Sequence, residues 1–160
     1  MRPAQREDLD VVLALIKGLA DYERLSHEVV ITAESLREHL FGERRYCECL
    51  LAEEPDGSVA GFALFFHTYS TFLGQPGIYL EDLFVWPERR GRGHGKALLA
   101  SLGKLALERG CGRLEWLVLN WNEPSIQFYR SLGAEALDGW TKNRVSGEAL
   151  TALADLAPDS

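Results

Sequence analysis

The chain has 160 residues, of which 46% are hydrophobic and 26% are charged. These values fit one folded domain and exclude a disordered, collagen-like or coiled-coil chain. Lys and Arg number 17 against 24 Asp and Glu, so the formal net charge is −7. An acidic surface repels phosphate groups, which argues against broad binding to nucleic acid or to an anionic membrane.

The first helix is predicted over residues 8–22, where apolar residues recur at helical spacing. Thr32 is a candidate cap for a second helix that would bury Leu36 and Leu40. Further along the chain, the predicted elements are strands over 47–53, 59–68 and 78–85, a helix ending near Arg109, a strand over 113–119, a helix over 124–132, a strand over 140–145 and a helix over 148–156.

The order of these elements predicts the fold class. The turn at residues 55–57 joins two strands into a hairpin, and a break at residues 74–77 precedes the next strand. The strand–helix–strand unit over 78–119 requires a right-handed crossover and a parallel strand pair. We therefore expect an α/β (α+β) fold with a mixed, mostly antiparallel sheet and flanking helices, built as one domain over residues 1–160.

No membrane span, secretory signal or metal site is predicted. The first ten residues are polar and contain no apolar signal core. The stretch 59–80 lacks Lys, Arg, Asp and Glu, but its histidine, proline and three glycines indicate two strands and a loop. Cys47, Cys49 and Cys111 lack partners at zinc-binding spacing, so we expect reduced thiols in a cytoplasmic protein.

Residues 83–96 carry the strongest functional signal, because a strand ends there, a glycine-rich loop follows and a helix begins. The first N–H groups of a helix lack partners and carry partial positive charge, and Arg90, Arg92 and Lys96 add cationic side chains. Together they predict a phosphate or pyrophosphate site, the alternative being a glycine-rich surface turn beside solvated arginines.

The glycine spacing narrows the phosphate ligand. It fits neither the Rossmann pattern nor a P-loop, since Ala97 stands where a P-loop has Ser or Thr. The spacing Arg90-x-x-Gly93-x-Gly95 instead resembles that of the GNAT N-acetyltransferase superfamily. Residues 121–125, with sequence Trp-Asn-Glu-Pro-Ser, and Gly139-Trp140 are similar to the diamine (spermidine/spermine) N-acetyltransferase branch, and the resemblance runs over residues 2–153.

The resemblance implies how acetyl-CoA is bound. The strand before the loop would pair with the pantetheine arm where the parallel strands splay, the loop would hold the pyrophosphate, and the segment before the later helix would contact the lower part of the coenzyme. The implied coenzyme-binding residues are Leu83, Phe84, Val85, Arg90, Gly91, Arg92, Gly93, His94, Gly95, Lys96, Asn122, Glu123, Pro124 and Ser125. The family's first strand would end near residues 2–3, so that strand is expected to be very short.

Acetyl transfer to an amine needs a proton acceptor and a proton donor. An aliphatic ammonium has a pKa of about 10.4, so a base must remove its proton before attack. Glu81 is the candidate base and Asp82 the second candidate, and strand alternation predicts that only one of them faces the cleft. Tyr129 matches the family's catalytic tyrosine, which protonates the departing thiolate. The structural alternatives are a sheet-edge ion pair and packing of Tyr129 with Phe128.

The acceptor is a small cationic amine by the same resemblance. Its binding residues would be Tyr22, Glu23, Glu81, Asp82 and Asp138. Ser70 stands where the polyamine enzymes are expected to have an acid, so a lysine-like amino acid such as thialysine is as suitable as spermidine. The branch also implies a homodimer. The alternatives are a catalytically silent acyl-CoA sensor, a protein or peptide N-acetyltransferase and, from the arginines, a nucleotide- or RNA-binding protein.

Overall fold

The computed structural model describes residues 1–158. The chain divides into two compact units, the first spanning Met1–Leu117 and the second beginning at Val118.

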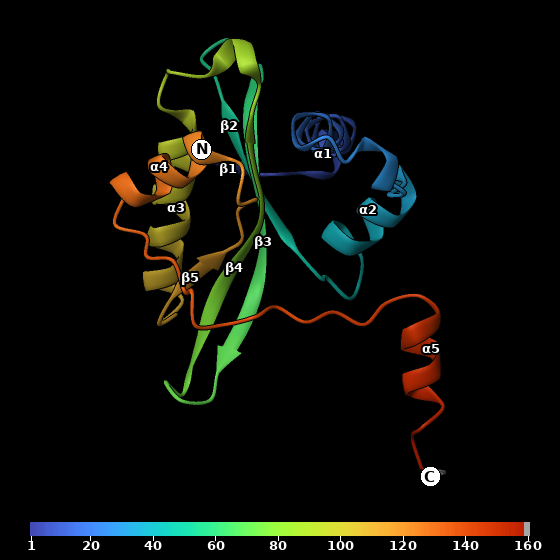
Figure 1. The fold of residues 1–160 in the computed structure, drawn as a ribbon. Coiled ribbons are helices and arrows are strands. Elements are labelled where there is room, and N and C mark those ends of the chain that lie inside the picture. Colours follow the sequence, from blue (N-terminus) through green and yellow to red (C-terminus); the bar gives the residue numbers. More distant parts are fainter. Residues whose placement is uncertain (159–160) are drawn as a thin grey trace. The chain divides into compact units, whose positions relative to one another are not determined.

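The first unit is built on one five-stranded sheet with strand order β1-β2-β3-β4-β5 (Figure 1). Its strands are β1 (Arg2–Pro3), β2 (Glu48–Glu53), β3 (Val59–Ser70), β4 (Gln75–Val85) and β5 (Leu114–Trp116). The neighbours from β1 to β4 pair antiparallel, whereas β4 and β5 pair parallel. The predicted mixed, mostly antiparallel sheet is thus confirmed, including its short first strand.

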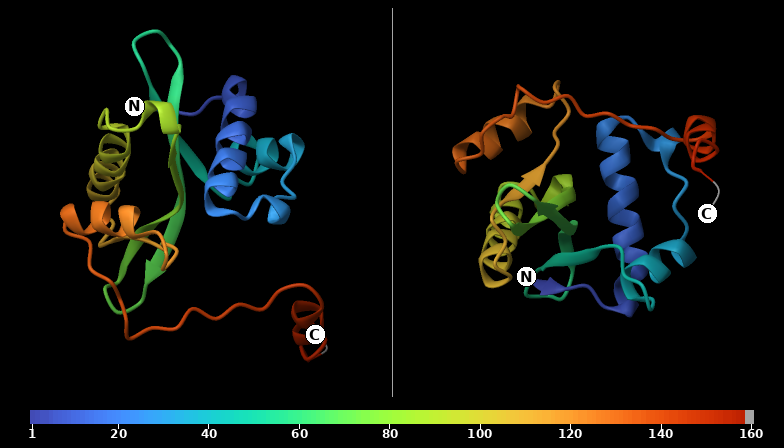
Figure 2. Two further views of the ribbon diagram at one scale, coloured as in Figure 1. Left: turned by 45° about the horizontal axis from the view of Figure 1, so that its top comes forward. Right: turned by 90° about the horizontal axis from the view of Figure 1, so that it is seen from below.

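Helices cover both faces of this sheet. The helices α1 (Leu9–Glu23) and α2 (Ala33–Phe41) lie on one face, and α3 (His94–Glu108) lies on the other (Figures 1 and 2). The α1–α2 face contains the main core cluster, in which Leu15 and Leu36 pack with Phe62 of β3. Thr32 caps α2 as predicted, because its hydroxyl accepts a hydrogen bond from the Ser35 N–H at 3.1 Å. Short 3₁₀ turns occur at Arg6–Asp8, Ser26–Glu28 and Pro87–Arg89.

Three strand predictions need correction. β4 begins at Gln75, because the turn covers residues 71–74 and residues 75–77 of the predicted break already pair with β3. β5 spans three residues instead of the predicted 113–119. The strand predicted at 140–145 is wrong: these residues are exposed and, within residues 1–158, pair with no strand. Apolar and β-branched residues favour a strand only where a neighbouring strand can pair with them.

The second unit contains the helices α4 (Glu123–Ser131) and α5 (Glu148–Ala154). The buried Asn122 caps α4, since its Oδ1 accepts a hydrogen bond from the Ser125 N–H at 3.4 Å. Pro124 lies in the first turn, where a missing N–H costs nothing, and Gly133 follows the helix with φ of +89°. The two predicted helices of this region are therefore confirmed.

Candidate active site

A β-bulge interrupts β4 at the two candidate catalytic carboxylates. Leu80 pairs with Phe65 of β3, and Asp82 pairs with the very next residue, Leu64. Glu81 is therefore an extra residue in β4, opposite none on β3. Strict alternation of side chains, from which the sequence predicted opposite directions for Glu81 and Asp82, does not hold at this point. Asp82 shares the face of its partner Leu64, which belongs to the core cluster under α1.

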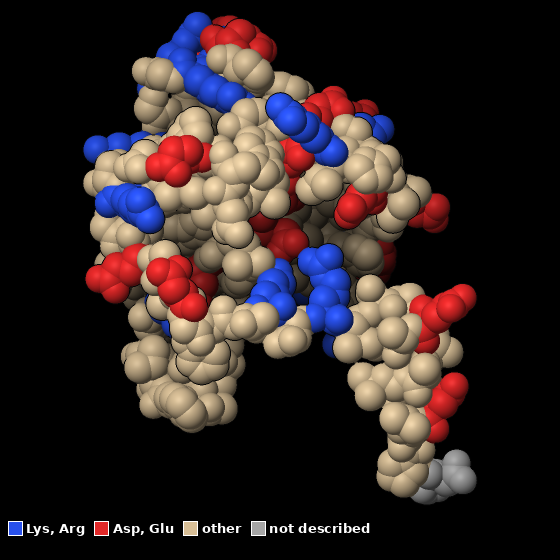
Figure 3. Space-filling view, in the orientation of Figure 1, with Lys and Arg blue, Asp and Glu red and all other residues tan. Residues whose placement is uncertain are grey.

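Burial perturbs the acidic groups on this face. Burial, with smaller contributions from the charges of Glu81 and Glu23, raises the pKa of Asp82 to about 7. Burial also raises the pKa of Glu23, the last residue of α1. Glu81 itself is exposed. In the space-filling view of Figure 3, red acidic side chains lie deep in a hollow on this side of the sheet.

One edge of β4 lacks a strand partner after the bulge. β5 pairs with Ile78–Leu80 only, so within residues 1–158 no strand covers that edge from Glu81 to Val85. The Trp86 N–H donates to the Ala60 carbonyl of β3 at 2.9 Å. Since successive N–H groups of a strand alternate in direction, those of Leu83 and Val85 point to the edge that β5 leaves uncovered.

The glycine loop ends at the start of α3. Gly91 and Gly93 have φ of +76° and +87°, a region that favours glycine, and an added Cβ at either would meet no atom within 4 Å. The first intrahelical hydrogen bond runs from the Ala97 N–H to the Gly93 carbonyl at 2.9 Å. The N–H groups of His94, Gly95 and Lys96 therefore have no acceptor within the helix, and Gly93 offers no side chain to cap them.

Arg90 points toward α1. Its Nε donates to the Val85 carbonyl at 3.0 Å, and its guanidinium lies over the Tyr22 ring at 4.7 Å and the Phe84 ring at 5.6 Å. Cation–π contacts of this kind stabilise the side chain against the aromatic rings. Tyr22, which the sequence assigned to the acceptor amine, is thus also part of the packing that fixes the loop.

Arg92 and His94 point toward Glu54 on the turn between β2 and β3. Arg89 contacts the same carboxylate. Sequence reasoning missed Glu54 because it lies 35 residues or more before the loop and belongs to no recognisable motif. Of the predicted cationic residues of the loop, Lys96 is exposed and makes no hydrogen bond or ion pair within residues 1–158.

In the second unit, α4 presents the other predicted groups. Tyr129 is half-buried, and its ring lies 5.3 Å from that of Phe128, which is also half-buried, so the two rings are in contact but outside the buried core. Asn122 to Ser125 form the start of α4, where Asn122 acts as the cap. Asp138 is exposed.

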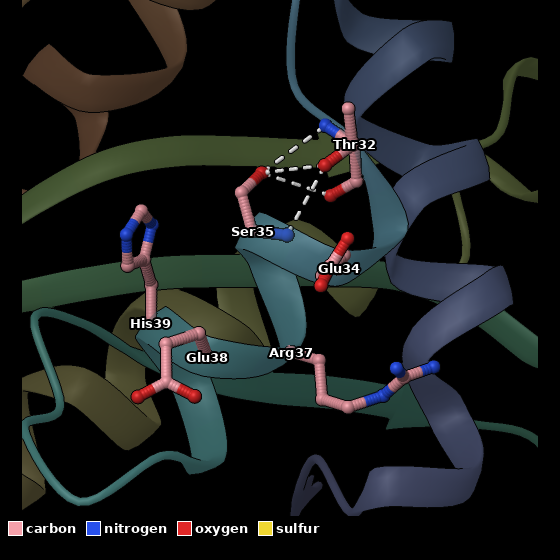
Figure 4. Close-up of a pocket in the computed structure, with 6 residues that line it drawn as sticks. All are labelled: Thr32, Glu34, Ser35, Arg37, Glu38 and His39. Carbon is pink, nitrogen blue, oxygen red and sulfur yellow. Dashed lines mark hydrogen bonds between the residues drawn. The ribbon is translucent and has the colours of Figure 1, made fainter.

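Two further features belong to the first unit. Ser70 is buried, and its Oγ accepts a hydrogen bond from the Leu73 N–H at 3.2 Å, so it supports the turn between β3 and β4. A hollow on α2 is lined by polar side chains, several of which point outward (Figure 4): Thr32, Glu34, Ser35, Arg37, Glu38 and His39. Within residues 1–158 no cluster of His, Cys, Asp or Glu could hold a metal ion, and no helix has the length and apolar character for crossing a membrane.

The fold and the strand–glycine loop–helix geometry define an acyltransferase architecture. The chain belongs to the acetyltransferase (GNAT) family, whose family model matches residues 16–134. A thialysine N-epsilon-acetyltransferase from Bos taurus is 42% identical, with 96% of each chain covered. An L-ornithine N5-acetyltransferase from Arabidopsis thaliana is 32% identical, covering 96% of this chain and 86% of that protein. An integron cassette protein from V. cholerae has 27% identity and a TM-score of 0.78, covering 96% and 95% of the two chains.

These relatives confirm the family predicted from the glycine loop. The chain is an N-acetyltransferase that acts on an amine of a small molecule. Membership of the family implies acetyl-CoA as the co-substrate. The geometry fits this ligand, because helix N–H groups without acceptors at His94–Lys96 suit a diphosphate and the uncovered edge of β4 suits an extended amide chain.

Proposed function

We propose that the protein transfers the acetyl group of acetyl-CoA to a primary amine of a lysine- or ornithine-like amino acid or of a polyamine. The acceptor attacks directly, with both substrates bound and no covalent enzyme intermediate. The observation that carries this proposal is the presence of two partly buried carboxyl groups with raised pKa, those of Glu23 and Asp82, together with the uncovered edge of β4. The family model extends across the boundary at residue 117, which supports one catalytic domain over the whole chain.

Main-chain groups provide the central contacts of the proposed coenzyme site. Leu83, Phe84 and Val85 would align the pantetheine arm along β4, and the N–H groups of Leu83 and Val85 support this because they face the uncovered edge. The loop from Arg90 to Lys96 would grip the diphosphate, supported by the N–H groups at the start of α3. Asn122, Glu123, Pro124 and Ser125 would contact the lower part of the coenzyme. Acetyl-CoA supplies the activated acetyl group.

The Glu81–Asp82 pair supplies the proton acceptor. An ammonium must be deprotonated before it attacks, and a base whose pKa lies near the working pH both exists in its ionised form and accepts the proton readily. Two observations support Asp82 as the group that takes the proton: its largely buried position and its pKa of about 7. The exposed Glu81 would then attract the cation and, by its charge, help to hold the pKa of Asp82 high.

Tyr129 is the proposed proton donor to the leaving thiolate. A tyrosine phenol in water has a pKa of about 10, close enough to that of a thiol for it to transfer a proton as the carbon–sulfur bond breaks. A main-chain N–H on β4, such as that of Val85, would stabilise negative charge on the carbonyl oxygen, a contribution of about 3–4 kcal/mol in comparable sites.

The acceptor site recognises positive charge. Glu23, Asp82 and the aromatic Tyr22 would form one end of it, and Asp138 would bind a second ammonium group of the acceptor. The named activities of the relatives, acetylation of thialysine and of ornithine, support an amino acid with a terminal amine. Ser70 supports the same choice, because it is engaged in a turn and supplies no second acidic subsite.

The proposed quaternary state is a homodimer in the cytoplasm. The second unit exposes large apolar side chains, which a partner subunit would cover. They are Leu137, Trp140, Val145, Leu150, Leu153 and Leu156. Light scattering coupled to size-exclusion chromatography tests this, and a monomer at micromolar concentration would refute it.

An amine panel with acetyl-CoA tests the proposed function. Thiol release is measured with thialysine, lysine, ornithine, putrescine and spermidine, and with a lysine-containing peptide. We expect the highest kcat/KM with thialysine or ornithine. Turnover of the peptide alone would favour a protein acetyltransferase, and coenzyme binding without any turnover would favour a silent acyl-CoA sensor.

A further inference from the structure

The Glu54 carboxylate contacts three side chains from the glycine loop and its flanks, two arginines and a histidine. Arg89 Nη1 lies 2.5 Å from Glu54 Oε2, Arg92 Nη1 lies 3.1 Å from Oε1, and His94 Nε2 lies 3.0 Å from Oε1. The Glu54 side chain is only 12% exposed. Glu54 therefore contacts the loop at three points, which are Arg89 before the first glycine, Arg92 between two glycines, and His94 at the start of α3.

The turn that carries Glu54 is itself firmly held. The Glu54 N–H donates to the Ser58 carbonyl at 2.8 Å, and the Gly57 N–H donates to the Glu54 carbonyl at 2.9 Å. Asp56 Oδ1 accepts hydrogen bonds from the N–H and the hydroxyl of Ser58 at 2.9 and 2.6 Å. The carboxylate thus projects from a closed hairpin turn, a rigid support for a loop whose two positive-φ glycines give it freedom.

The charges at this cluster require an anion at its centre. The two guanidinium groups that share this carboxylate would repel each other without it. The hydrogen bond with His94 and the charges of Arg89 and Arg92 lower the pKa of Glu54 below its ordinary value, so Glu54 is ionised at neutral pH. The cluster keeps a net positive charge with Glu54 included, and it still attracts phosphate groups.

We infer that Glu54 is a positioning residue for coenzyme binding. It holds Arg89, Arg92 and His94 on the side of the β2–β3 turn, which fixes the path of the loop into α3. The N–H groups of residues 94–96 and the Lys96 side chain then remain for the diphosphate. This inference rests on the proposed role of the loop in binding acetyl-CoA.

A positioning role and a purely electrostatic role of Glu54 predict opposite changes in coenzyme affinity when Glu54 is replaced. If Glu54 acted only through its charge, removing a negative group near a phosphate site would tighten coenzyme binding. If Glu54 positions the loop, the Glu54→Gln variant binds coenzyme more weakly although the loop becomes more positive. Glu88 provides the matched control: it lies in the 3₁₀ turn before the loop, is exposed and makes no hydrogen bond or ion pair within residues 1–158.

The experiment compares Glu54→Gln, Glu54→Asp and Glu88→Gln with the native enzyme. We expect Glu54→Gln to raise the calorimetric Kd for coenzyme A and the KM for acetyl-CoA about tenfold, the effect of one charged hydrogen-bonding group. Its kcat at saturating acetyl-CoA and its KM for the amine stay within twofold. Glu88→Gln stays within twofold in all three constants, because it removes the same charge without touching the cluster.

Glu54→Asp covers the case in which Glu54→Gln does not fold. It keeps the charge but is one methylene shorter, so it cannot reach all three of Arg89, Arg92 and His94. We therefore expect a KM for acetyl-CoA between those of the native enzyme and Glu54→Gln. An unchanged or lowered KM in either Glu54 variant overturns the inference. If the native enzyme gives no heat with coenzyme A, the proposed function fails; if it binds normally and the variants match it, only the role of Glu54 fails.

Discussion

The Asp82 carboxyl makes the stability of the protein depend on pH in an unusual direction. Its pKa is raised from 3.8 to about 7 by burial and by the neighbouring charges of Glu81 and Glu23. Between about pH 4 and pH 7 the native state therefore holds this proton more tightly than the unfolded chain does. Linkage then requires that this group's contribution to stability is full below pH 4 and is lost as the pH rises through 7.

The size of the effect follows from the shift. A shift of about three pKa units at 1.36 kcal/mol each amounts to about 4 kcal/mol at pH 8. An Asp82→Asn variant cannot ionise and escapes this loss, although its amide still has to be desolvated. At pH 4 the native carboxyl is protonated, and burying it has a desolvation cost similar to that of the Asn amide. The two proteins should therefore differ little in stability at pH 4. We expect Asp82→Asn to be more stable than native protein by about 2–4 kcal/mol at pH 8 and by less than about 1 kcal/mol at pH 4.

Urea unfolding at pH 4, 6 and 8, followed by the fluorescence of the four tryptophans, measures this difference. The matched control is Glu81→Gln, a neighbouring carboxylate that is exposed. We expect Glu81→Gln to regain only a small part of the stability lost at pH 8, because the charge of Glu81 causes only a small part of the shift in the Asp82 pKa. A stability difference between Asp82→Asn and native protein that is the same at pH 4 and pH 8, or a less stable variant at pH 8, would refute the reasoning.

The same residue should govern the rate. As the proposed proton acceptor, Asp82 must be ionised, so kcat/KM for the amine should rise with pH to a plateau above about 7. Asp82→Asn should lose this rise and at least about a hundredfold of activity. A variant that is more stable but nearly inactive would show that the site maintains an unfavourable carboxylate for its chemistry.

Three further predictions concern other parts of the molecule. Gly93→Ala should lose about 1–2 kcal/mol of stability, because the φ of Gly93 is +87°. Gly103 lies inside α3 with open space around an added Cβ, so Gly103→Ala should gain about 0.5–1 kcal/mol. Urea unfolding of both variants measures these changes. Arg109 binds Glu48 through two hydrogen bonds of 2.5 and 2.8 Å at a partly exposed site, so Arg109→Met should lose about 1 kcal/mol, and less in 1 M salt, as shown by thermal unfolding. Tyr129→Phe should lower kcat about a hundredfold with little change in the KM for acetyl-CoA, and unchanged thiol release would contradict its role as proton donor.

The sequence was informative where the signal is local. Gly91 and Gly93 adopt positive φ angles that favour glycine, and the helix predicted to end near Arg109 does end there, at Glu108. Thr32 and Pro124 likewise mark helix starts through chemistry that acts within four residues. Such features depend on few neighbours, so one sequence is enough to predict them.

The features that the sequence did not reveal are set by pairing across the fold. Glu54 reaches the loop only because β2, β3 and β4 bring the two turns together, and no spacing within the chain encodes that contact. The predicted strand at 140–145 had the right residue types but has no neighbour to pair with in the described chain. Both errors come from contacts that a periodicity argument does not include.

The bulge at Glu81 shows how one irregularity can serve several parts of the proposed site. Without the extra residue, Leu80 and Asp82 would be adjacent and would still lie on opposite faces, because their partners Phe65 and Leu64 are adjacent and alternate. The bulge therefore leaves the core register intact on both sides and adds a carboxylate between them. The bulge also lies just where pairing with β5 ends at Leu80, so the N–H groups of Leu83 and Val85, which point away from β3, face no strand. A regular strand of the same composition would keep the core but would lack both the second carboxylate and the divergence from β5 on which the proposed chemistry depends.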